Sequence, residues 1–577
     1  MSNRATGRPS PEEGGGTVAH VLVWLLWHLG IRDAWGVCGR EIVPVWSAFL
    51  ATLGTAYAIA TRHARHENGA GFAALGSWTQ TDRPVAVFVT TGPGLTNALT
   101  SLETARAAGA KLVLISPLTP ADERGRLGIQ ATGPGGYATP DLHAPGRLFD
   151  LVAAIETPEQ LTTVAGRLAS GLQGPGGFAA HIAIPTKLQA QPARVPLAVP
   201  AHRRTAPALT AAAADELTAL LASAPFGVWV GWGARKHAAA VRRLLDRTGA
   251  PVVSSPRGLG IADVHPAFLG VTGNGGSASL PERVGALGLH RMLVLGTGLG
   301  EATSGWDVDL VPPGGLIHVD LDPSVFGHAY PAADTVGVQA DVGAFLEAIL
   351  ERADRLPHRP PAWPRGGLEL GAVRDVDGGG AADGDGDGDG VGVHPAALMA
   401  AIQRIVVDGT DMPVFADASS AMFWGARHLT FAEPGRWIVE NRFGAMGSAG
   451  AAVVGAASGR GGPAAAICGD GALHMQDEIN TAVRYGIRAL WIVLNDGGLG
   501  IVRTGMEKAG WPAHDADYPE TDFAAVARAK GAQALRVEHE SDLDEALAAA
   551  VDASGPFVLD VVVDRRAAAP LGARAKR

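Results

Sequence analysis

The stretch "CGDGALHMQDEINTAVRYGIRALWIVLNDGGLG", residues 468–500, decides the fold class of this chain. It holds the end of one apolar strand, a Gly-Asp-Gly turn at 469–471, and a second apolar strand that ends in Asn495-Asp496. Parallel strands that are buried on both faces have continuous apolar sequences, and ligands bind at their carboxyl ends. We therefore expect both polar clusters to meet at one edge of a parallel sheet.

The two clusters carry oxygen atoms that suit a hard cation. Asp470 and Asp496 offer carboxylates, and Gly498 offers a backbone carbonyl. Three such ligands, with coordination positions left for phosphate oxygens, predict a Mg²⁺ or Ca²⁺ site that holds a diphosphate. Gly469 and Gly471 allow the backbone to approach a ligand closely. Because Gly-Asp-Gly and Asn-Asp-Gly are also turn sequences, two ordinary strand-end turns explain this segment alone equally well.

Apolar strands alternate with helical patterns along most of the chain, which predicts an α/β fold of three consecutive doubly wound parallel-sheet domains. The expected domains are 17–188, 208–355 and 391–566. The remaining segments are a mobile N-terminal segment (1–16), a Pro/Ala/Arg-rich linker (189–207), a Pro/Gly/Asp-rich linker (356–390) and a C-terminal tail (567–577). The expected strands lie within 84–92, 111–117, 179–185, 227–233, 251–255, 292–298, 316–323, 413–419, 464–471, 489–498 and 557–564.

Composition narrows the class of protein. The chain has 577 residues, 47% of them apolar and 18% charged, which suits a large soluble α/β protein. A net charge of −10 gives no electrostatic reason to expect nucleic acid or an anionic membrane as a partner. Cys38 and Cys468 are far apart, so neither a disulfide framework nor a Cys-based zinc site is expected, and a cytoplasmic location fits.

Two segments have a competing interpretation. The apolar run 21–31 is too short to span a bilayer and lacks a basic region before it, so we expect the first core helix there. The run "DGDGDGDG" within 356–390 has the acidic character of a calcium loop. It lacks the closing glutamate of an EF-hand, so we expect a flexible linker.

The segment 468–500 resembles the thiamin diphosphate motif, in which Gly-Asp-Gly precedes Asn-Asn by some two dozen residues. The resemblance implies that Asp470, Asp496 and the carbonyl of Gly498 bind Mg²⁺, and that Gly469, Gly471, Ala472 and Asn495 surround the diphosphate. Two residues depart from the motif. Asp496 replaces the usual asparagine and adds a negative charge, and Ala472 replaces a serine that often helps to hold the diphosphate.

A second motif lies far upstream, in "TRHARHENGAGFAALG" (61–76) and the following "TTGPGLTNAL" (90–99). Together they resemble segments of the acetolactate synthase-like family. By position, Glu67 is the carboxyl group that activates the cofactor by hydrogen bonding to its pyrimidine ring, so that the cofactor's own amino group can take the proton from the reactive carbon. The loop residues implied to line the pyrimidine are Gly92, Pro93, Gly94 and Asn97. Taken alone, Glu67 is better explained as a salt-bridged surface residue.

The resemblance extends over nearly all of the chain. "NRFGAMGSAG" (441–450) matches the family's Gly-x-Met-Gly segment, which implies that Gly444 and Met446 contact the cofactor and that Met446 holds it in a bent shape. A methionine that only packs a core is the alternative. "DASSAMFW" (417–424) aligns with a diphosphate-holding segment, where Ser419 and Ser420 stand in place of the usual Gln and His.

The middle block resembles the family's central Rossmann-like domain. Its Gly-x-Gly-x-Gly at 296–300 lacks the full dinucleotide spacing, and FAD, which some relatives bind there, is a minor expectation. In relatives the glutamate and the diphosphate site of one active centre come from different subunits. The resemblance therefore implies a homodimer or a homotetramer.

The substrate-facing positions depart from the acetolactate synthase pattern. Gln130 matches the Phe-Gln-Glu segment of the family, but Ile129 and Ala131 replace its neighbours. We place Gln130 among the catalytic candidates. Arg40 and Glu41 occupy a loop where a relative that makes carboxyethyl-arginine also has Gly-Arg-Glu, although a surface ion pair explains them at least as well. His474 and Gln476 are further substrate candidates.

The sequence predicts decarboxylation of a small 2-oxo acid followed by carboligation to a second carbonyl compound, with a weak indication of specialised biosynthesis. A simple 2-oxo acid decarboxylase that releases an aldehyde is the main alternative. A nicotinamide-dependent dehydrogenase built on the middle block and an inactive cofactor-binding subunit are less favoured. An intact Glu67 speaks against the inactive subunit.

Overall fold

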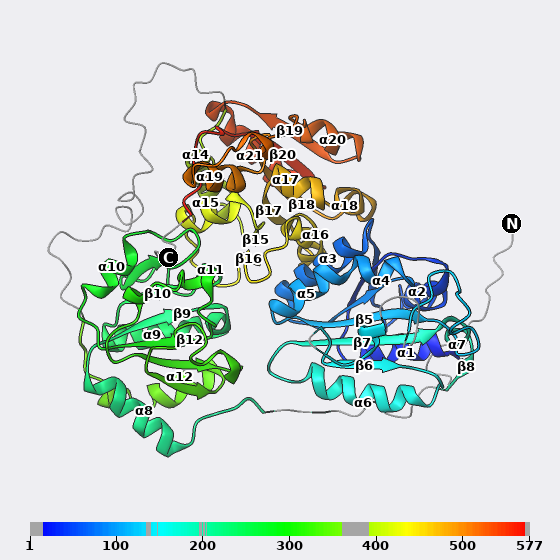
Figure 1. Ribbon diagram of the computed structural model, residues 1–577, viewed down its shortest axis with the longest axis horizontal. Coiled ribbons are helices and arrows are strands. Elements are labelled where there is room, and N and C mark those ends of the chain that lie inside the picture. The colour runs from blue at the N-terminus through cyan, green and yellow to red at the C-terminus, as the bar shows by residue number, and fades with distance from the viewer. Residues whose placement is uncertain are drawn as a thin grey trace. The chain divides into compact units, whose positions relative to one another are not determined.

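The computed structural model describes residues 16–133, 140–146, 148–194, 199, 202, 205–360 and 392–571. Figure 1 shows three sheets along the chain, coloured blue to cyan, green, and yellow to red. Each is a six-stranded sheet in which every pairing is parallel. The predicted α/β class with three parallel sheets is confirmed. Most of the predicted N-terminal segment, most of the linker 356–390 and the end of the tail fall outside the described residues.

The described residues separate into two compact units. The first contains the first sheet together with residues 451–462 and 477–487, and the second contains the central and third sheets with most of the remaining chain. Each unit is described by itself below. Among the described residues, no helix combines the length and the apolar character that a bilayer crossing requires.

The first sheet has the strand order β3-β2-β4-β5-β7-β6. Its strands are β2 (Asp33–Gly36), β3 (Ala60–His63), β4 (Val85–Phe88), β5 (Lys111–Leu118), β6 (Leu151–Ala154) and β7 (Phe178–Pro185). Its helices are α1 (Val18–His28), α2 (Val43–Ala51), α3 (Glu67–Thr81), α4 (Pro93–Asn97), α5 (Leu99–Ala107), α6 (Gln160–Leu172) and α7 (Thr186–Gln189). The short strands β1 (Gly16–Thr17) and β8 (Pro192–Ala193) form a separate pair.

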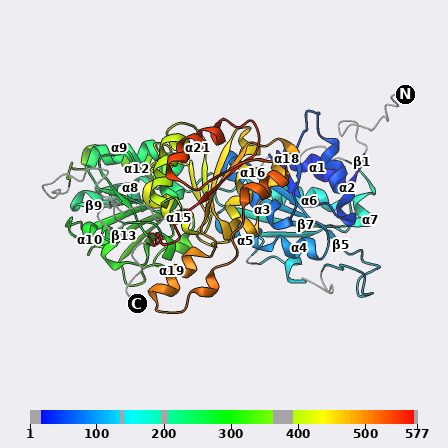
Figure 2. The same ribbon diagram turned by 90° about the horizontal axis from the view of Figure 1, so that it is seen from above.

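Most of the apolar run 21–31 lies in α1, which ends at His28, so the predicted first core helix is present. Helices α1 and α2 pack side by side, as Figure 2 also shows, and share one core cluster with residues of α6. Helix α3 packs against α5 and against strands β2 and β4. The sheet is thereby covered by helices, which explains why its central strands β4, β5 and β7 are almost continuously apolar.

The central sheet has the order β11-β10-β9-β12-β13-β14, the arrangement of a dinucleotide-binding Rossmann fold. Its strands are β9 (Phe226–Val230), β10 (Val252–Ser254), β11 (Phe268–Val271), β12 (Arg291–Leu295), β13 (Leu316–Asp320) and β14 (Thr335–Gln339). Its helices are α8 (Ala211–Ser223), α9 (Ala238–Thr248), α10 (Leu280–Gly285), α11 (Glu301–Ser304) and α12 (Val342–Leu350).

The third sheet has the order β16-β15-β17-β18-β20-β19, so its chain path repeats that of the first sheet. Its strands are β15 (Val414–Ala416), β16 (Trp437–Val439), β17 (Ala464–Gly469), β18 (Ala489–Asn495), β19 (Gln533–Val537) and β20 (Phe557–Val562). Its helices in the second unit are α14 (Pro395–Ile402), α15 (Ser420–His428), α17 (Asp470–Met475), α19 (Gly500–Lys508), α20 (Phe523–Ala529) and α21 (Leu543–Asp552). Helix α18 (Ile479–Tyr485) and most of α16 (Ser448–Arg460) lie in the first unit.

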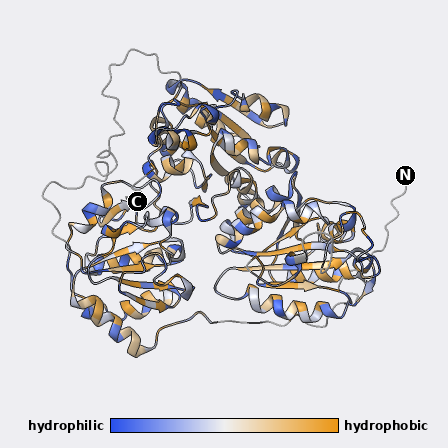
Figure 3. Cartoon of the chain, viewed as in Figure 1, coloured by the Kyte–Doolittle hydropathy of each residue, from blue (hydrophilic) through white to orange (hydrophobic). Residues whose placement is uncertain are grey.

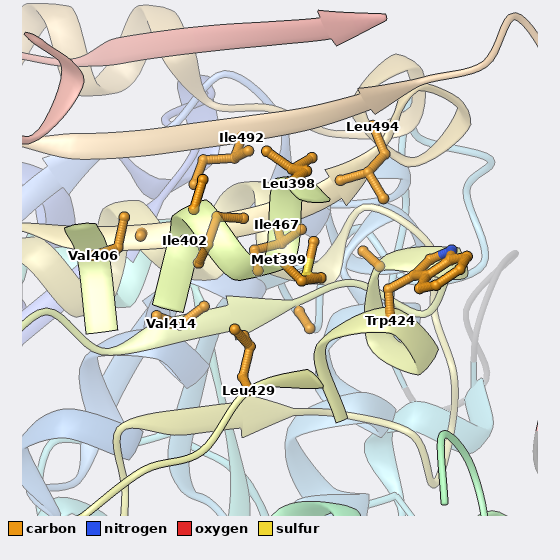
Figure 4. Close-up of a cluster of buried hydrophobic side chains, with 14 of the residues drawn as sticks. Leu398, Met399, Ile402, Val406, Val414, Trp424, Leu429, Ile467, Ile492 and Leu494 are labelled. Carbon is orange, nitrogen blue, oxygen red and sulfur yellow. The ribbon is translucent and has the colours of Figure 1, made fainter. Parts of the chain in front are cut away.

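The core of the third sheet is assembled between α14 and the central strands (Figure 4). Leu398, Met399 and Ile402 of α14 pack with side chains of β15, β17 and β18, all fully or almost fully buried. The inner strands of the three sheets are largely apolar (Figure 3). Burial of this kind contributes about 1.5–3 kcal/mol for each large aliphatic side chain, so the sheet is a rigid support for the loops at its edge.

Strand order identifies where a ligand would bind. In the third sheet, β15 and β17 are neighbours although β16 lies between them in sequence, which makes their boundary a topological switch point. Ligands of open α/β sheets bind outside the carboxyl ends of the strands at such a point. Asp417 to Ser419 follow β15, and the Gly-Asp-Gly turn follows β17. The first sheet has the equivalent point between β2 and β4.

Candidate active site

The three residues predicted to bind a metal lie together at the carboxyl edge of the third sheet. Gly469 is paired with Leu494 in the ladder, so Asp470 lies beside the turn that carries Asp496. The backbone N–H of Gly498 donates to Oδ2 of Asp470 over 3.1 Å. The hydroxyl of Tyr518 donates to the carbonyl oxygen of Gly498 over 3.2 Å. Tyr518 was not among the residues predicted from the sequence.

The two carboxylates interact electrostatically. Burial, followed by the nearby charge of Asp496, raises the pKa of Asp470 to about 6. Burial also raises the pKa of Asp496, while the guanidinium of Arg503 opposes that rise. Two like charges held close in a poorly solvated place are stabilised by a bound cation.

Asp496 has an ion-pair partner that the sequence did not indicate. Arg503, on the first turns of α19, donates from Nη2 to Oδ2 of Asp496 and from Nη1 to Oδ1 of Asp517 over 2.7 Å. Its side chain is only 9% exposed. One feature of the sequence could have predicted this pair. An arginine seven residues after Asp496 can reach its carboxylate if a helix begins between the two residues.

Residues that would surround a diphosphate lie around the Gly-Asp-Gly turn. The N–H of Gly469 donates to Oγ of Ser419 over 3.2 Å. Ser420 begins α15 and lines a small cavity together with Asp496 and Arg503. A Cβ at Gly471 would lie 2.8 Å from a methyl of Leu499, so only glycine fits this turn without displacing a neighbour.

Met446 lies near the same turn. Its Cε is 3.4 Å from where a Cβ on Gly471 would be, and its own side chain is half-buried. Gly444, two residues before it, has a φ of 72° and open space around its Cα, which suits a close approach by a ligand. Ala472 is buried in α17, and its carbonyl accepts the N–H of Gln476.

Asn495 and the two substrate candidates differ in their surroundings. The side-chain nitrogen of Asn495 donates to the carbonyl of Thr521 and to Asp560, whereas its buried Oδ1 has no hydrogen-bond partner among the described residues. His474 packs its ring against Tyr518 and Phe523. Gln476 is 9% exposed and packs beside Gly447.

Asp417 is a further residue that the sequence did not identify. It is fully buried after β15, and its carboxylate accepts the N–H groups of Gly447 (3.0 Å) and Ala449 (2.9 Å). Burial raises its pKa to about 6, and these donors partly offset the rise. Asp417 thereby fixes the turn that presents Met446.

The predicted activating carboxylate lies in the first unit. Glu67 begins α3 and is 8% exposed. The side-chain amide of Asn97, at the end of α4, donates to its Oε2 over 3.2 Å. A Cβ at Gly94 would lie 3.5 Å from Oε1 and 2.8 Å from a methyl of Thr90. The structure therefore brings Glu67, Gly94 and Asn97 together; Pro93 is the first residue of α4.

Gln130 lies beside the same loop. Its Cβ is 3.0 Å from the position of a Cβ on Gly92, whose φ is 59°, and Thr91 donates to its side-chain oxygen over 3.4 Å. Gln130 itself has a φ of 55°. Ile129 next to it is 95% exposed.

A buried carboxylate supports the start of α3. Glu478 accepts the N–H of Arg65 (2.9 Å) and the N–H of His66 (3.1 Å), the two residues before Glu67, and also bonds the hydroxyl of Thr481. It is 2% exposed and has a φ of 48°. Its place in the polar segment "MQDEIN" gave no signal of burial.

Arg40 and Glu41 form an ion pair of 3.8 Å on the surface, with the Arg40 side chain 96% exposed. None of the hydrogen bonds and ion pairs recorded for the described residues joins either side chain to Glu67, Gly92 or Gln130. The surface ion pair, the alternative interpretation from the sequence, matches this arrangement. Contact of Arg40 and Glu41 with the substrate therefore stays a proposal.

The residues present fit thiamin diphosphate with a divalent cation. The glycine turn at 469–471 that a Cβ would obstruct and the two carboxylates beside a carbonyl are what such a group requires. Among the described residues no three His, Cys, Asp or Glu side chains group as metal ligands, so a cation here would depend on the Gly498 carbonyl as well.

Comparison with known proteins agrees with this geometry. Three family models match successive parts of the chain: the N-terminal TPP binding domain (16–134), the central domain (214–349) and the C-terminal TPP binding domain (417–561) of thiamine pyrophosphate enzymes. The central model spans all strands of the central sheet, whereas the other two span β2 to β5 of the first sheet and β16 to β20 of the third almost completely.

Curated relatives match over almost the whole length. A Mycobacterium tuberculosis (strain H37Rv) protein provisionally named acetolactate synthase large subunit IlvB2 is 29% identical over 535 residues, 87% of this chain and 90% of its own. The acetolactate synthase isozyme 1 large subunit of Escherichia coli K12 is 26% identical over 561 residues, 95% of this chain and 94% of its own. An acetolactate synthase of Mycobacterium avium is 27% identical over 577 residues, 95% of this chain and 87% of its own. The chain therefore belongs to the thiamine pyrophosphate-dependent enzymes of the acetolactate synthase-like family.

Proposed function

We propose that this enzyme uses thiamin diphosphate and Mg²⁺ to decarboxylate a small 2-oxo acid and to join the resulting fragment to a second carbonyl compound. The observation that carries the proposal is the grouping of Asp470, Asp496 and Gly498 at the switch point of the third sheet. The similarity to acetolactate synthase large subunits supports carboligation as the second step.

In this proposal, Asp470, Asp496 and the Gly498 carbonyl hold the cation, and Gly469, Gly471, Ala472, Asn495, Ser419 and Ser420 surround the diphosphate. Glu67 takes the pyrimidine end, where Gly92, Pro93, Gly94 and Asn97 form the adjoining loop and Gly444 and Met446 support the cofactor. When bound, thiamin diphosphate supplies a carbon nucleophile and an electron sink for cleaving the bond to the carboxylate.

The residues of the chain then hold a proton at the cofactor and orient the substrate. Glu67 holds or shares a proton with the pyrimidine nitrogen, and Asn97 fixes the orientation of its carboxyl group. Gln130, beside the Gly92 turn, is placed to hydrogen-bond a carbonyl or carboxylate oxygen of the substrate. His474 and Gln476, and more remotely Arg40 and Glu41, complete the proposed substrate contacts.

Substrate choice, assembly and location are finer proposals. The replacements at Ile129 and Ala131 favour a second substrate other than the one that acetolactate formation uses, in a specialised biosynthetic role. A simple decarboxylase is the second candidate, because the same replacements remove residues that would hold an acceptor. We also propose a homodimer or homotetramer in the cytoplasm, where Cys38 and Cys468 stay reduced, with FAD as a minor option in the central domain.

The test is mass spectrometry of the products formed from pyruvate with thiamin diphosphate and Mg²⁺, beside a Glu67→Gln control. Acetolactate that is absent in the control supports carboligation, whereas acetaldehyde alone supports the decarboxylase. If the cofactor binds and neither product forms, pyruvate is the wrong substrate. If calorimetry finds no thiamin diphosphate binding with Mg²⁺, the proposed function is wrong.

A further inference from the structure

The place of Asp496 raises a problem of charge. The family motif has a neutral asparagine where this chain has an aspartate, and Asp470 is already a carboxylate at the same edge. A bound diphosphate would bring further negative charge. Two adjacent carboxylates oppose an anionic ligand unless a cationic group offsets one of them.

Arg503 is such a group. Its guanidinium bonds Oδ2 of Asp496 through Nη2 and Oδ1 of Asp517 through Nη1 (2.7 Å). A pair held by the fork of an arginine keeps a fixed geometry, which a lysine would not provide. The side chains of Arg503 and Asp496 are 9% and 16% exposed, so solvent screens the pair weakly.

The surrounding backbone is built for this pair. A Cβ on Gly500 would lie 2.4 Å from Oδ2 of Asp496, so the carboxylate occupies the space that a side chain at the start of α19 would take. A Cβ on Gly498 would lie 2.9 Å from Nη1 of Arg503. The arginine therefore lies directly behind the backbone that supplies the third proposed ligand.

Asp517, the second carboxylate that Arg503 bonds, stabilises the loop that contains Gly498. Gly498 pairs with Asp517 as an isolated bridge, and the N–H of Leu499 donates to the carbonyl of Ala516 over 2.8 Å. Asp517 also forms an ion pair of 2.5 Å with Arg565. Arg503 thus connects Asp496 to a segment that is itself bonded to the Gly498 loop.

We propose that Arg503 is a positioning residue that makes an aspartate usable at position 496. It neutralises the charge of Asp496, fixes one carboxylate oxygen, and leaves the other to serve the cation as the amide oxygen of asparagine does in relatives. This inference rests on the proposed function, since it assigns Asp496 to the cation that holds thiamin diphosphate.

A double-mutant cycle tests the proposal with two readouts other than turnover. Arg503→Gln, Asp496→Asn and the double variant are compared with the wild type by urea unfolding of the protein without cofactor, and by calorimetric titration with thiamin diphosphate at fixed Mg²⁺. We expect Arg503→Gln to weaken thiamin diphosphate binding at least tenfold. Adding Asp496→Asn restores the affinity to within about threefold, because an uncharged residue no longer needs the arginine.

Arg404→Gln is the matched control, since Arg404 pairs with Asp544 at 2.6 Å but both side chains are more than half exposed. It should leave cofactor affinity unchanged. Arg503→Lys, which keeps the charge and loses the fork, should fall between wild type and Arg503→Gln. If Arg503→Gln does not fold, the Lys variant and the double variant still decide the outcome.

Additive effects of the two substitutions, in both unfolding and binding, would overturn the inference. So would cofactor binding that Arg503→Gln leaves unchanged. These results differ from a failure of the proposed function, in which the wild type itself would not bind thiamin diphosphate.

Discussion

The side-chain amide of Asn97 donates a hydrogen bond of 3.2 Å to the carboxylate of Glu67, the residue at the start of α3. The two residues are thirty positions apart and come from different helices of the first sheet's domain. The contact orients a nearly buried carboxyl group whose proposed task is to hold a proton against the pyrimidine of the cofactor. Its removal should therefore affect turnover more than folding.

Glu67→Gln should lower product formation by roughly 10²–10⁴-fold, as expected when a positioned acid–base group is lost. Asn97→Ala, which keeps the carboxyl group but frees its orientation, should cost less, on the order of tenfold. Steady-state product formation measures both effects, and calorimetry checks that thiamin diphosphate still binds. Glu216→Gln, at an exposed position of α8, is the control. Full activity in Glu67→Gln would contradict the role of Glu67.

Gly471→Ala should weaken cofactor binding. The new Cβ would lie 2.8 Å from a methyl of Leu499 and 3.1 Å from the Tyr518 hydroxyl, so these side chains must move, including the hydroxyl that bonds the Gly498 carbonyl. Because a shift of this kind misplaces the proposed ligands, we expect at least a tenfold higher dissociation constant for thiamin diphosphate, a loss of about 1.4 kcal/mol.

Gly505→Ala is the matched control for that substitution. Gly505 lies in α19 with nothing within 4 Å of its Cβ position, so alanine should leave binding unchanged and raise helix stability by about 0.5–1 kcal/mol. Equal binding by the two alanine variants would show that the turn at 469–471 does not hold the cofactor.

Asp417 should make stability fall as the pH rises. Burial raises the pKa of its carboxyl from 3.8 to about 6, so the folded protein holds this proton more tightly than the unfolded chain does. The stability that this proton contributes is present below about pH 4 and is lost as the pH rises to about 6. The free energy of unfolding of the wild type should therefore decrease across this window by up to about 3 kcal/mol more than that of Asp417→Asn. Urea unfolding at several pH values measures it, and parallel profiles would contradict the prediction.

Glu478→Gln should destabilise the start of α3. A glutamine offers one carbonyl oxygen where the carboxylate accepts the N–H groups of Arg65 and His66 and the hydroxyl of Thr481. Leaving a buried donor without an acceptor costs about 1–3 kcal/mol, which unfolding in urea should detect. Turnover should fall with it, because Glu67 directly follows these two residues. An unchanged unfolding midpoint would show that the contact contributes nothing.

The sequence by itself determined the α/β class, the strands that carry the site and the grouping of Asp470 with Asp496. Continuous apolar strands such as 489–495 require burial on both faces, and the polar residues after them must then share one edge of a sheet. The place of Glu67 beside Asn97 followed from two motifs of the family that the sequence resembles. These features depend on residues close in sequence or on a repeated local pattern.

Only the tertiary structure decided the roles of Asp417, Glu478, Arg503 and Tyr518. Each acts through a contact with a segment that the sequence does not place: Asp417 holds a turn thirty residues away, and Glu478 bonds residues more than four hundred positions before it. A polar residue in a polar segment has no periodicity that signals burial. The packing of strands and loops decides which polar residues are buried and which partners they have. It is this packing that pairs Asp496, which departs from the asparagine of the family motif, with Arg503.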